Sequence, residues 1–168
     1  MKQYLALAAL CLAPVVAQTP QRWSATTGAV SLSSAGSAAT IQQPATGASQ
    51  IIFEYAVVYC SVACQATITA NGAAATTTAG TVQALLPSSN LGATAPFNFF
   101  TASNASGGVQ QGGIVYVQAG VSQLLCLNTQ CGQPQTVSLG GAGTNINYTI
   151  SIGAITGTAN ITYFLETK

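Results

Sequence analysis

The chain has 168 residues, but only three are Lys or Arg, two are Asp or Glu, and none is His. That is 3% charged residues, whereas an average soluble domain is about a quarter charged. Without an imidazole there can be no Ser–His–acid triad, and calcium sites usually recruit several carboxylates, which are missing here. We therefore expect a protein that is not an enzyme and that needs no cofactor or metal.

The N-terminus has the pattern of a signal peptide over residues 1–17. Lys2 supplies a positive start, Leu5 to Pro14 form a short apolar run, and Val15-Val16-Ala17 supply the small residues of a cleavage site. A lipid anchor on Cys11 is the alternative, but Leu10 stands where a small residue should precede that cysteine. The pattern predicts a protein that is secreted to the extracellular space or the cell surface.

Cleavage before Gln18 would leave Arg22 and Lys168 against Glu54 and Glu166, which is a neutral balance of side-chain charge. A neutral chain offers no basic surface to phosphates, so we expect no nucleic-acid partner. A membrane-spanning helix needs about 20 apolar residues in a row. The best later run, Ile51 to Ala63, is shorter and contains Glu54, so no membrane span is expected.

Residues 18–48 are rich in Ser, Ala and Thr, with few large apolar anchors, and they predict either one or two strands or a loose N-terminal arm. The pattern sharpens at Ser49. From Ile51 to Cys60 both alternating faces are apolar except at Glu54, which is typical of a central strand. A sandwich domain is therefore predicted over residues 49–168.

A strand is predicted from Cys64 to Ala70, where the alternation centres on Ile68. The following Asn71-Gly72 is the dipeptide best suited to a type I′ turn, because both residues tolerate positive φ. We therefore expect Ala73 to Leu85 to return antiparallel in a hairpin. Pro87 to Pro96 is predicted to be a loop.

Phe97, Phe99 and Phe100 mark a further strand, and a Gly-rich break is expected from Ser106 to Gly113. Beyond this break, Ile114 to Gln118 and Val121 to Leu127 flank Ala119-Gly120, which predicts a second hairpin.

The C-terminal region alternates strictly after the turn at residues 140–143. Ile146, Tyr148, Ile150 and Ile152 alternate with polar residues, and the same pattern recurs at Ile161, Tyr163 and Leu165, which predicts strands buried on one face. Helical spacing is not sustained after the signal peptide. Eight to ten short strands separated by turns predict an all-β fold, a two-sheet antiparallel sandwich that is jelly-roll-like.

Four cysteines remain after cleavage: Cys60, Cys64, Cys126 and Cys131. An even number in an exported chain predicts disulfides, whereas a tetrathiolate zinc site would favour two intervening residues within each pair rather than three and four. An extended strand would separate the Cα atoms of Cys60 and Cys64 by about 13 Å, too far for a disulfide. Two local disulfides, each closing a turn, are preferred over bonds between the two regions.

Glu54 and Glu166 are the only candidates for a pair of catalytic carboxyl groups. We expect instead a glutamate at a strand edge and another on the C-terminal surface. Three N-glycosylation sequons begin at Asn104, Asn147 and Asn160, and the last two fall on the polar phase of their strands. They predict a glycoprotein if the producing cell can glycosylate.

A chain with so few charges cannot protect its sheet edges in the usual way, with Lys or other charged side chains. Val30, Leu32, Ala39 and Ile41 alternate weakly in Thr27 to Gln42, ahead of the sandwich region. In this respect the chain resembles secreted β-sandwich subunits of extracellular filaments. The resemblance implies self-association, in which Thr27 to Gln42 could enter the next subunit. The alternative is that these residues form the first strands of their own sandwich.

Glycan binding is the second functional hypothesis. Trp23, Tyr59, Phe100 and Tyr116 could offer stacking faces, and abundant Gln and Asn could bind hydroxyl groups. Most aromatic residues, however, lie in phase with buried positions. A non-catalytic structural or cell-surface protein that assembles by edge-strand pairing is therefore the leading prediction, and glycans are the alternative partner.

Overall fold

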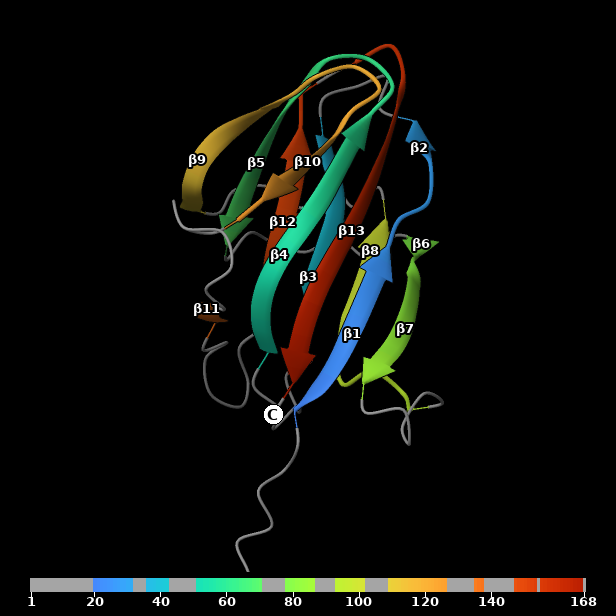
Figure 1. Cartoon of the computed structure of the whole chain (residues 1–168), viewed down its shortest axis with the longest axis vertical. Helices are drawn as coiled ribbons and strands as arrows, with labels where there is room; N and C mark the ends of the chain where they lie inside the picture. Colours follow the sequence, from blue (N-terminus) through green and yellow to red (C-terminus); the bar gives the residue numbers. More distant parts are fainter. Residues whose placement is uncertain are drawn as a thin grey trace, which may run out of the picture.

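The computed structural model describes residues 20–31, 36–42, 51–70, 78–86, 93–101, 109–126, 135–137, 147–153 and 155–167. These residues form two antiparallel sheets that face each other, so the predicted all-β sandwich is confirmed (Figure 1). Its jelly-roll connectivity stays a prediction. The strands are β1 (Gln21–Thr26), β2 (Val30–Ser31), β3 (Gly36–Gln42), β4 (Ile51–Cys60), β5 (Cys64–Ala70), β6 (Thr78–Ala79), β7 (Thr81–Leu86), β8 (Asn98–Thr101), β9 (Val109–Val117), β10 (Ser122–Leu125), β11 (Gln135–Val137), β12 (Asn147–Ile152) and β13 (Thr158–Thr167).

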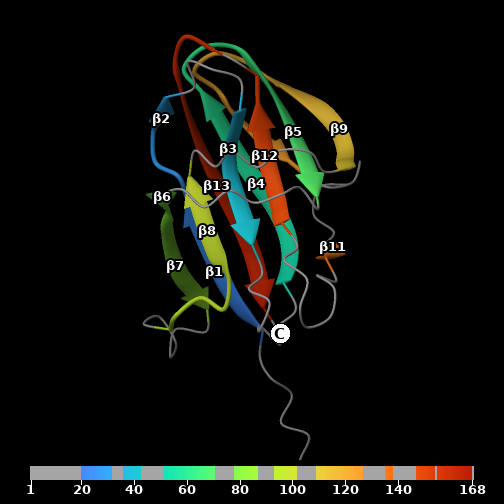
Figure 2. The same cartoon turned by 180° about the vertical axis from the view of Figure 1, so that it is seen from behind.

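The seven-stranded sheet has the order β10-β4-β13-β1-β7, with β11 paired to β4 and β2 paired to β13. The six-stranded sheet, which faces the viewer in Figure 2, has the order β6-β8-β3-β12-β5-β9. Strands distant in sequence are neighbours in both sheets. β4 lies between β13 and the pair β10 and β11, so the prediction of a central strand over Ile51 to Cys60 is confirmed. No helix of the described residues is long and apolar enough to cross a membrane.

The core lies between the two sheets and is filled by alternating side chains. Val58, Ile161 and Leu165 of the seven-stranded sheet meet Ile68 and Ile150 of the six-stranded sheet, all almost fully buried. The outward residues of β13 are less buried, which confirms one-face burial for that strand. In β12 the predicted inward residues Ile150 and Ile152 are buried, but one outward residue departs from the predicted pattern.

The exception in β12 is Thr149, an outward residue that is nevertheless buried. Its hydroxyl lies 2.9 Å from the hydroxyl of Thr40 on β3, and either group can be the donor. Burial of a polar side chain is tolerated when it has such a hydrogen bond. Alternation of residue types alone could not reveal this pair.

Tyr163 links the two sheets through the middle of the core. Its hydroxyl donates a hydrogen bond to the carbonyl of Ala39 and accepts one from the N–H of Ile150, each at 3.1 Å. Ala39 and Ile150 are cross-strand partners next to a register shift between β3 and β12. The hydroxyl therefore bridges backbone groups of two paired strands of the six-stranded sheet, while its residue belongs to β13 of the other sheet.

The chain crosses between sheets at two glycines. Gly80 joins β6 of the six-stranded sheet to β7 of the seven-stranded sheet, and a Cβ atom there would lie 2.3 Å from the Phe99 ring. Gly120 has a φ of 73° and lies in the turn closed by the hydrogen bond from Val121 N–H to the Gln118 carbonyl. Only glycine fits at position 80, because a side chain would clash with Phe99. Position 120 favours glycine because its φ is positive.

Both predicted hairpins are corrected by these crossings. Asn71-Gly72 lies outside the described residues, but β6 and β7 pair with β8 and β1, because both edges of β5 are taken by β12 and β9. The turn at Ala119-Gly120 is present, yet β9 pairs with β5 and β10 pairs with β4. The turn signal at Ala119-Gly120 thus marked a change of sheet and not a hairpin.

The N-terminal segment belongs to the sandwich. β1 lies between β13 and β7, and β3 lies between β12 and β8. The described residues of Thr27 to Gln42 therefore form strands of the chain's own sheets, as the alternative to strand donation expected.

The predicted Gly-rich break from Ser106 to Gly113 was wrong from Val109 onward, because β9 begins at that residue. A register irregularity in the pairing of β9 with β5 accommodates Gly112-Gly113.

Candidate functional site

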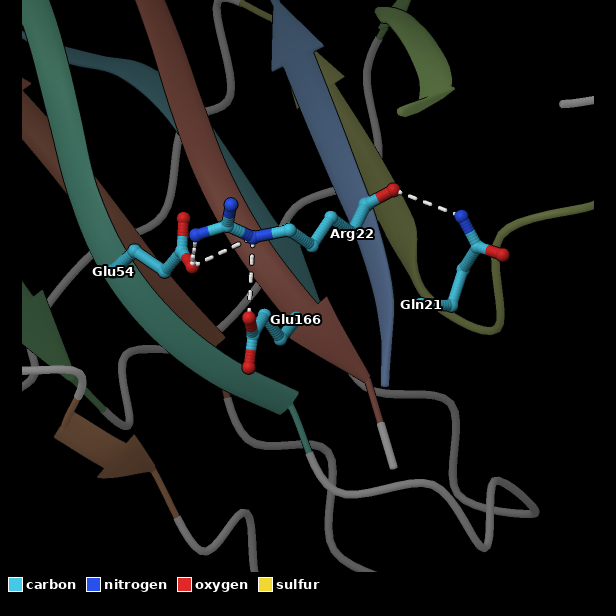
Figure 3. Close-up of polar contacts among 4 residues, drawn as sticks. All are labelled: Gln21, Arg22, Glu54 and Glu166. Atoms are coloured by element: carbon cyan, nitrogen blue, oxygen red, sulfur yellow. Dashed lines mark hydrogen bonds and ion pairs between the residues drawn. The ribbon is translucent and has the colours of Figure 1, made fainter. Parts of the chain in front are cut away.

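The first candidate site is a charge cluster on the outer face of the seven-stranded sheet, formed by Arg22 of β1, Glu54 of β4 and Glu166 of β13 (Figure 3). Arg22 Nε lies 3.1 Å from Glu54 Oε1 and 3.1 Å from Glu166 Oε1. The terminal Nη2 of Arg22 also contacts Glu54 Oε1. These are the only Lys, Arg, Asp or Glu residues among those described.

Strand register brings the three side chains together. Arg22 and Glu166 are direct cross-strand partners. Glu54 lies where the pairing of β4 with β13 skips a residue, because Phe164 pairs with Tyr55 and Leu165 with Phe53. Such a bulge re-aims a side chain. Glu54 is thus on an interior strand, and the expectation of a strand-edge glutamate was wrong.

The charge cluster is satisfied within the chain. The hydrogen bond and charge of Glu54, and to a lesser degree those of Glu166, raise the pKa of Arg22, while partial burial acts in the opposite direction. A glycosidase needs two carboxyl groups that flank a sugar, one of which delivers a proton. Here the guanidinium group occupies the space between the carboxylates. The arrangement therefore fits a structural ion cluster better than a catalytic pair.

An aromatic pair lies beside this cluster on the same face. The rings of Tyr55 and Phe164, which are cross-strand partners, stack with centroids 4.7 Å apart and an interplanar angle of 27°. Each ring covers a face of the other. The pair strengthens the contact between β4 and β13 but does not present two free stacking faces to a ligand.

The second candidate site lies at the end of the sandwich that holds the Cys60–Cys64 disulfide, which we call the disulfide end. This bond, with Cα atoms 6.3 Å apart, confirms the predicted local disulfide and the turn at residues 61–63. Cys126 is also disulfide-bonded, and its expected partner, Cys131, lies outside the described residues. The β4–β5 turn, the β9–β10 turn and the β12–β13 connection meet at this end, at the top of Figure 1.

Backbone hydrogen bonds fasten the three turns to one another. Ser61 N–H donates to the Thr158 carbonyl, and Thr158 N–H donates to Ser61 Oγ, both at 2.9 Å. Gly120 N–H donates to the Cys60 carbonyl, also at 2.9 Å. The disulfide end is therefore held by covalent and hydrogen-bonded contacts among segments far apart in sequence.

A pocket of about 450 Å³ opens at the disulfide end, over the ends of β5, β9 and β12. Tyr116 lines it with a side chain that is 67% exposed. No lining residue is charged. The pocket is lined by Ala63, Cys64, Gln65, Tyr116, Val117, Gln118, Gly153 and Ile155.

Comparisons with protein-family models, curated proteins and solved structures find no match. We therefore infer the function of the protein from the geometry of its candidate sites. Among the described residues, no group of three or more His, Cys, Asp or Glu side chains could hold a metal ion.

The four aromatic residues predicted to offer stacking faces do not gather in one site. Trp23 is only 3% exposed, and its indole N–H donates to Thr167 Oγ1 at 2.9 Å. Phe100 is partly buried on β8, and Tyr59 lies on the outer face of the other sheet. Only Tyr116 borders the pocket. Its partners there, Gln65 and Gln118, were missed because nothing in the sequence shows which strand lies beside β9.

The predicted glycosylation residues are spread over the chain. Asn160 is exposed on β13 and accepts a hydrogen bond from the Thr26 hydroxyl at 3.2 Å. Asn147 is the first residue of β12, and Asn104 lies outside the described residues. Asn160 is therefore a sequon residue whose side chain is accessible.

Proposed function

We propose that this protein is an exported, non-catalytic structural protein of the extracellular space or cell surface, and that it assembles into filaments by pairing edge strands. The observation that carries the proposal is where the charges lie. In the described residues they occur only on β1, β4 and β13, three neighbouring interior strands. The strands at the sheet ends, β6, β7, β9, β10 and β11, contain no charged residue.

Edge strands are normally protected by charged side chains or proline, because their unpaired backbone groups can bind another strand. β9 is nine residues long and has neither. It ends the six-stranded sheet, and no described strand pairs with its outer side. Ile114 on this strand is 47% exposed. The segment from Ile114 to Val117 therefore supports addition of a strand from another copy.

A filament requires contact between two different edges, because such a contact repeats without closing. The opposite end of the six-stranded sheet is formed by β6 and β8. β9 of one copy would pair with this end of the next copy and extend the sheet along the filament. Contact of β9 with β9 would instead close a dimer.

Sedimentation velocity over a range of concentrations, with electron microscopy of the same secreted protein, tests the proposal. We expect larger species as concentration rises, and filaments in the images. Ile114→Lys should suppress both, because it places a charge on the pairing edge. Thr158→Lys is the matched control, since it adds the same charge at an exposed site on interior strand β13. A wild-type protein that stays monomeric, or equal effects of the two variants, would show the proposal to be wrong.

A further inference from the structure

We propose that the pocket at the disulfide end binds a neutral saccharide, with the ring of Tyr116 as its stacking surface. This site goes beyond self-assembly, because it adds a ligand that neither sheet edge requires. The ligand class follows from the exposure of one aromatic ring, from the chemistry of the pocket lining, and from the absence of charge around it.

Tyr116 is the most exposed aromatic residue of those that the structure describes, at 67%. Tyr116 pairs with Gln65 across β9 and β5. The flanking pairs are Val115–Ala66, in which Ala66 is buried and Val115 is partly buried against the core, and the buried pair Val117–Cys64, so the Tyr116 side chain points away from the core. None of the aromatic pairs among the described residues includes it. An exposed ring without a stacking partner can receive the apolar C–H face of a sugar.

The lining of the pocket supplies the other contacts that a sugar needs. Its volume of about 450 Å³ lies within the range of small-molecule sites, about 300–1,000 Å³. Val117 and Ile155 provide apolar surface, while the amide groups of Gln65 and Gln118 can both donate and accept hydrogen bonds. Hydroxyl groups around a sugar ring need both kinds of partner.

Charge selects a neutral ligand. The pocket lining contains no charged side chain, and the three described charged residues lie on β1, β4 and β13 of the other sheet, engaged with one another. An ionic sugar would lose water on entering the pocket without gaining a counter-charge. Sulfated or carboxylated saccharides should therefore bind less well than neutral ones.

The pocket is also held in place before a ligand arrives. The Cys60–Cys64 disulfide fixes the start of β5, and Gly153 N–H donates to the Gln65 carbonyl at 3.2 Å, joining β12 to β5. A site whose walls are already ordered loses less conformational entropy on binding.

The test is calorimetric titration of the oxidised, secreted protein with three neutral probes, cellotetraose, maltotetraose and tetra-N-acetylchitotetraose. We expect at least one to bind, and Tyr116→Ala to weaken that binding about tenfold or more, as loss of a stacking face should. Tyr116→Phe keeps the ring and should bind within about threefold of wild type. Tyr59→Ala removes a partly exposed tyrosine from the other sheet and should bind normally.

Three results would overturn the site: no binding of any of these probes, equal binding by Tyr116→Ala and wild type, or tighter binding of a sulfated tetrasaccharide. Sedimentation of Tyr116→Ala separates this proposal from self-assembly. If that variant loses assembly and binds sugar normally, the pocket receives a second copy of the chain instead. If Ile114→Lys is monomeric but still binds sugar, the two functions are independent, as we expect.

Discussion

The interior strands β1, β4 and β13 differ from the edge strand β9 in how they are held. The interior strands are cross-linked by the Arg22–Glu54–Glu166 cluster and by the stacked Tyr55 and Phe164 rings. β9 is held by its ladder to β5, which is itself irregular, and it exposes Ile114 and Tyr116. The charges of the described residues thus stabilise the middle of a sheet, whereas many proteins use charges to protect the edges.

This difference implies unequal local stability. Strands with many buried contacts open only when the whole domain unfolds, whereas a strand with exposed side chains on a sheet edge can open locally. β9 should therefore be available for contact with another chain under conditions in which β13 stays closed. The following substitutions test the two halves of the comparison in order of expected effect.

The largest effect is expected at Tyr163, in the interior. Tyr163→Phe keeps the ring contacts with Phe53 and Phe99 but removes the hydroxyl that binds Ala39 and Ile150. Two buried backbone groups would lose a partner, each costing about 1–3 kcal/mol. We expect the free energy of unfolding, measured in urea, to fall by about 2–4 kcal/mol. Tyr55→Phe, on the outer face, should cost less than about 0.5 kcal/mol, and equal losses would contradict the assigned role of the Tyr163 hydroxyl.

The next effect is expected at the Cys60–Cys64 disulfide, which joins interior strand β4 to β5 of the other sheet. Closing so short a loop stabilises a protein by about 2 kcal/mol in the loop-entropy description. Replacing both cysteines with serine should lower the free energy of unfolding by about that amount, measured by urea denaturation. The Cys126 disulfide stays intact in this variant as an internal control. A loss of less than about 0.5 kcal/mol would mean that the hydrogen bonds of Ser61 hold the turn by themselves.

Alkaline pH provides a third test of the interior. Burial raises the pKa of Tyr163 well above its ordinary value of 10.0, although the hydrogen bond from Ile150 acts in the opposite direction. Above pH 10 the unfolded chain therefore loses a proton that the folded chain keeps, so stability falls as pH rises. Burial of Tyr148 acts in the same sense.

Wild type should have a higher free energy of unfolding than Tyr163→Phe at pH 8. This difference in free energy of unfolding should become about 1.4 kcal/mol smaller at pH 11, because only wild type carries the buried hydroxyl. Urea denaturation at the two pH values measures it. A difference that stays constant would show that Tyr163 is not the group responsible for alkaline destabilisation.

Alternation in the sequence was enough to predict β4 as a central strand and β13 as a strand buried on one face. The spacing of Cys60 and Cys64 showed that a local disulfide would need a turn between them, and the local bond was preferred over bonds between the two cysteine regions. These strands and this turn depend only on residues that are close together in the sequence. The partners of β5 and β10 could not be predicted, because a good turn dipeptide does not show which strand the next strand will pair with.

The charge cluster lay beyond sequence reasoning for a related reason. Arg22 and Glu166 meet only because β1 pairs with β13 in one register, and Glu54 joins them only because β4 has a bulge at that residue. A slip of one residue would point the same side chains to the opposite face. The pocket could not be predicted for the same reason. Only the pairing of β9 with β5 shows that Tyr116 borders a pocket, whereas Trp23 and Phe100 do not.

A smaller effect is expected in the charge cluster. Arg22→Met leaves Glu54 and Glu166 near each other without their shared cation, and because the cluster is partly exposed we expect a loss of about 1 kcal/mol. The loss should shrink in 1 M salt, which screens the repulsion between the carboxylates. Adding Glu54→Gln and Glu166→Gln to Arg22→Met should restore most of the stability. Urea denaturation checks both variants, and an unchanged loss after the two Gln substitutions would contradict an electrostatic cause.

The smallest effect on stability is expected at the edges, where lysine should change the free energy of unfolding by less than about 0.5 kcal/mol. Gln83 is exposed on β7, an edge strand of the seven-stranded sheet, as Ile114 is on β9, an edge strand of the six-stranded sheet. Because assembly is proposed to extend the six-stranded sheet, Ile114→Lys should abolish association while Gln83→Lys leaves it intact. Sedimentation velocity at one concentration compares them. Association that is lost only in Gln83→Lys would place the contact on the seven-stranded sheet and refute the role of β9.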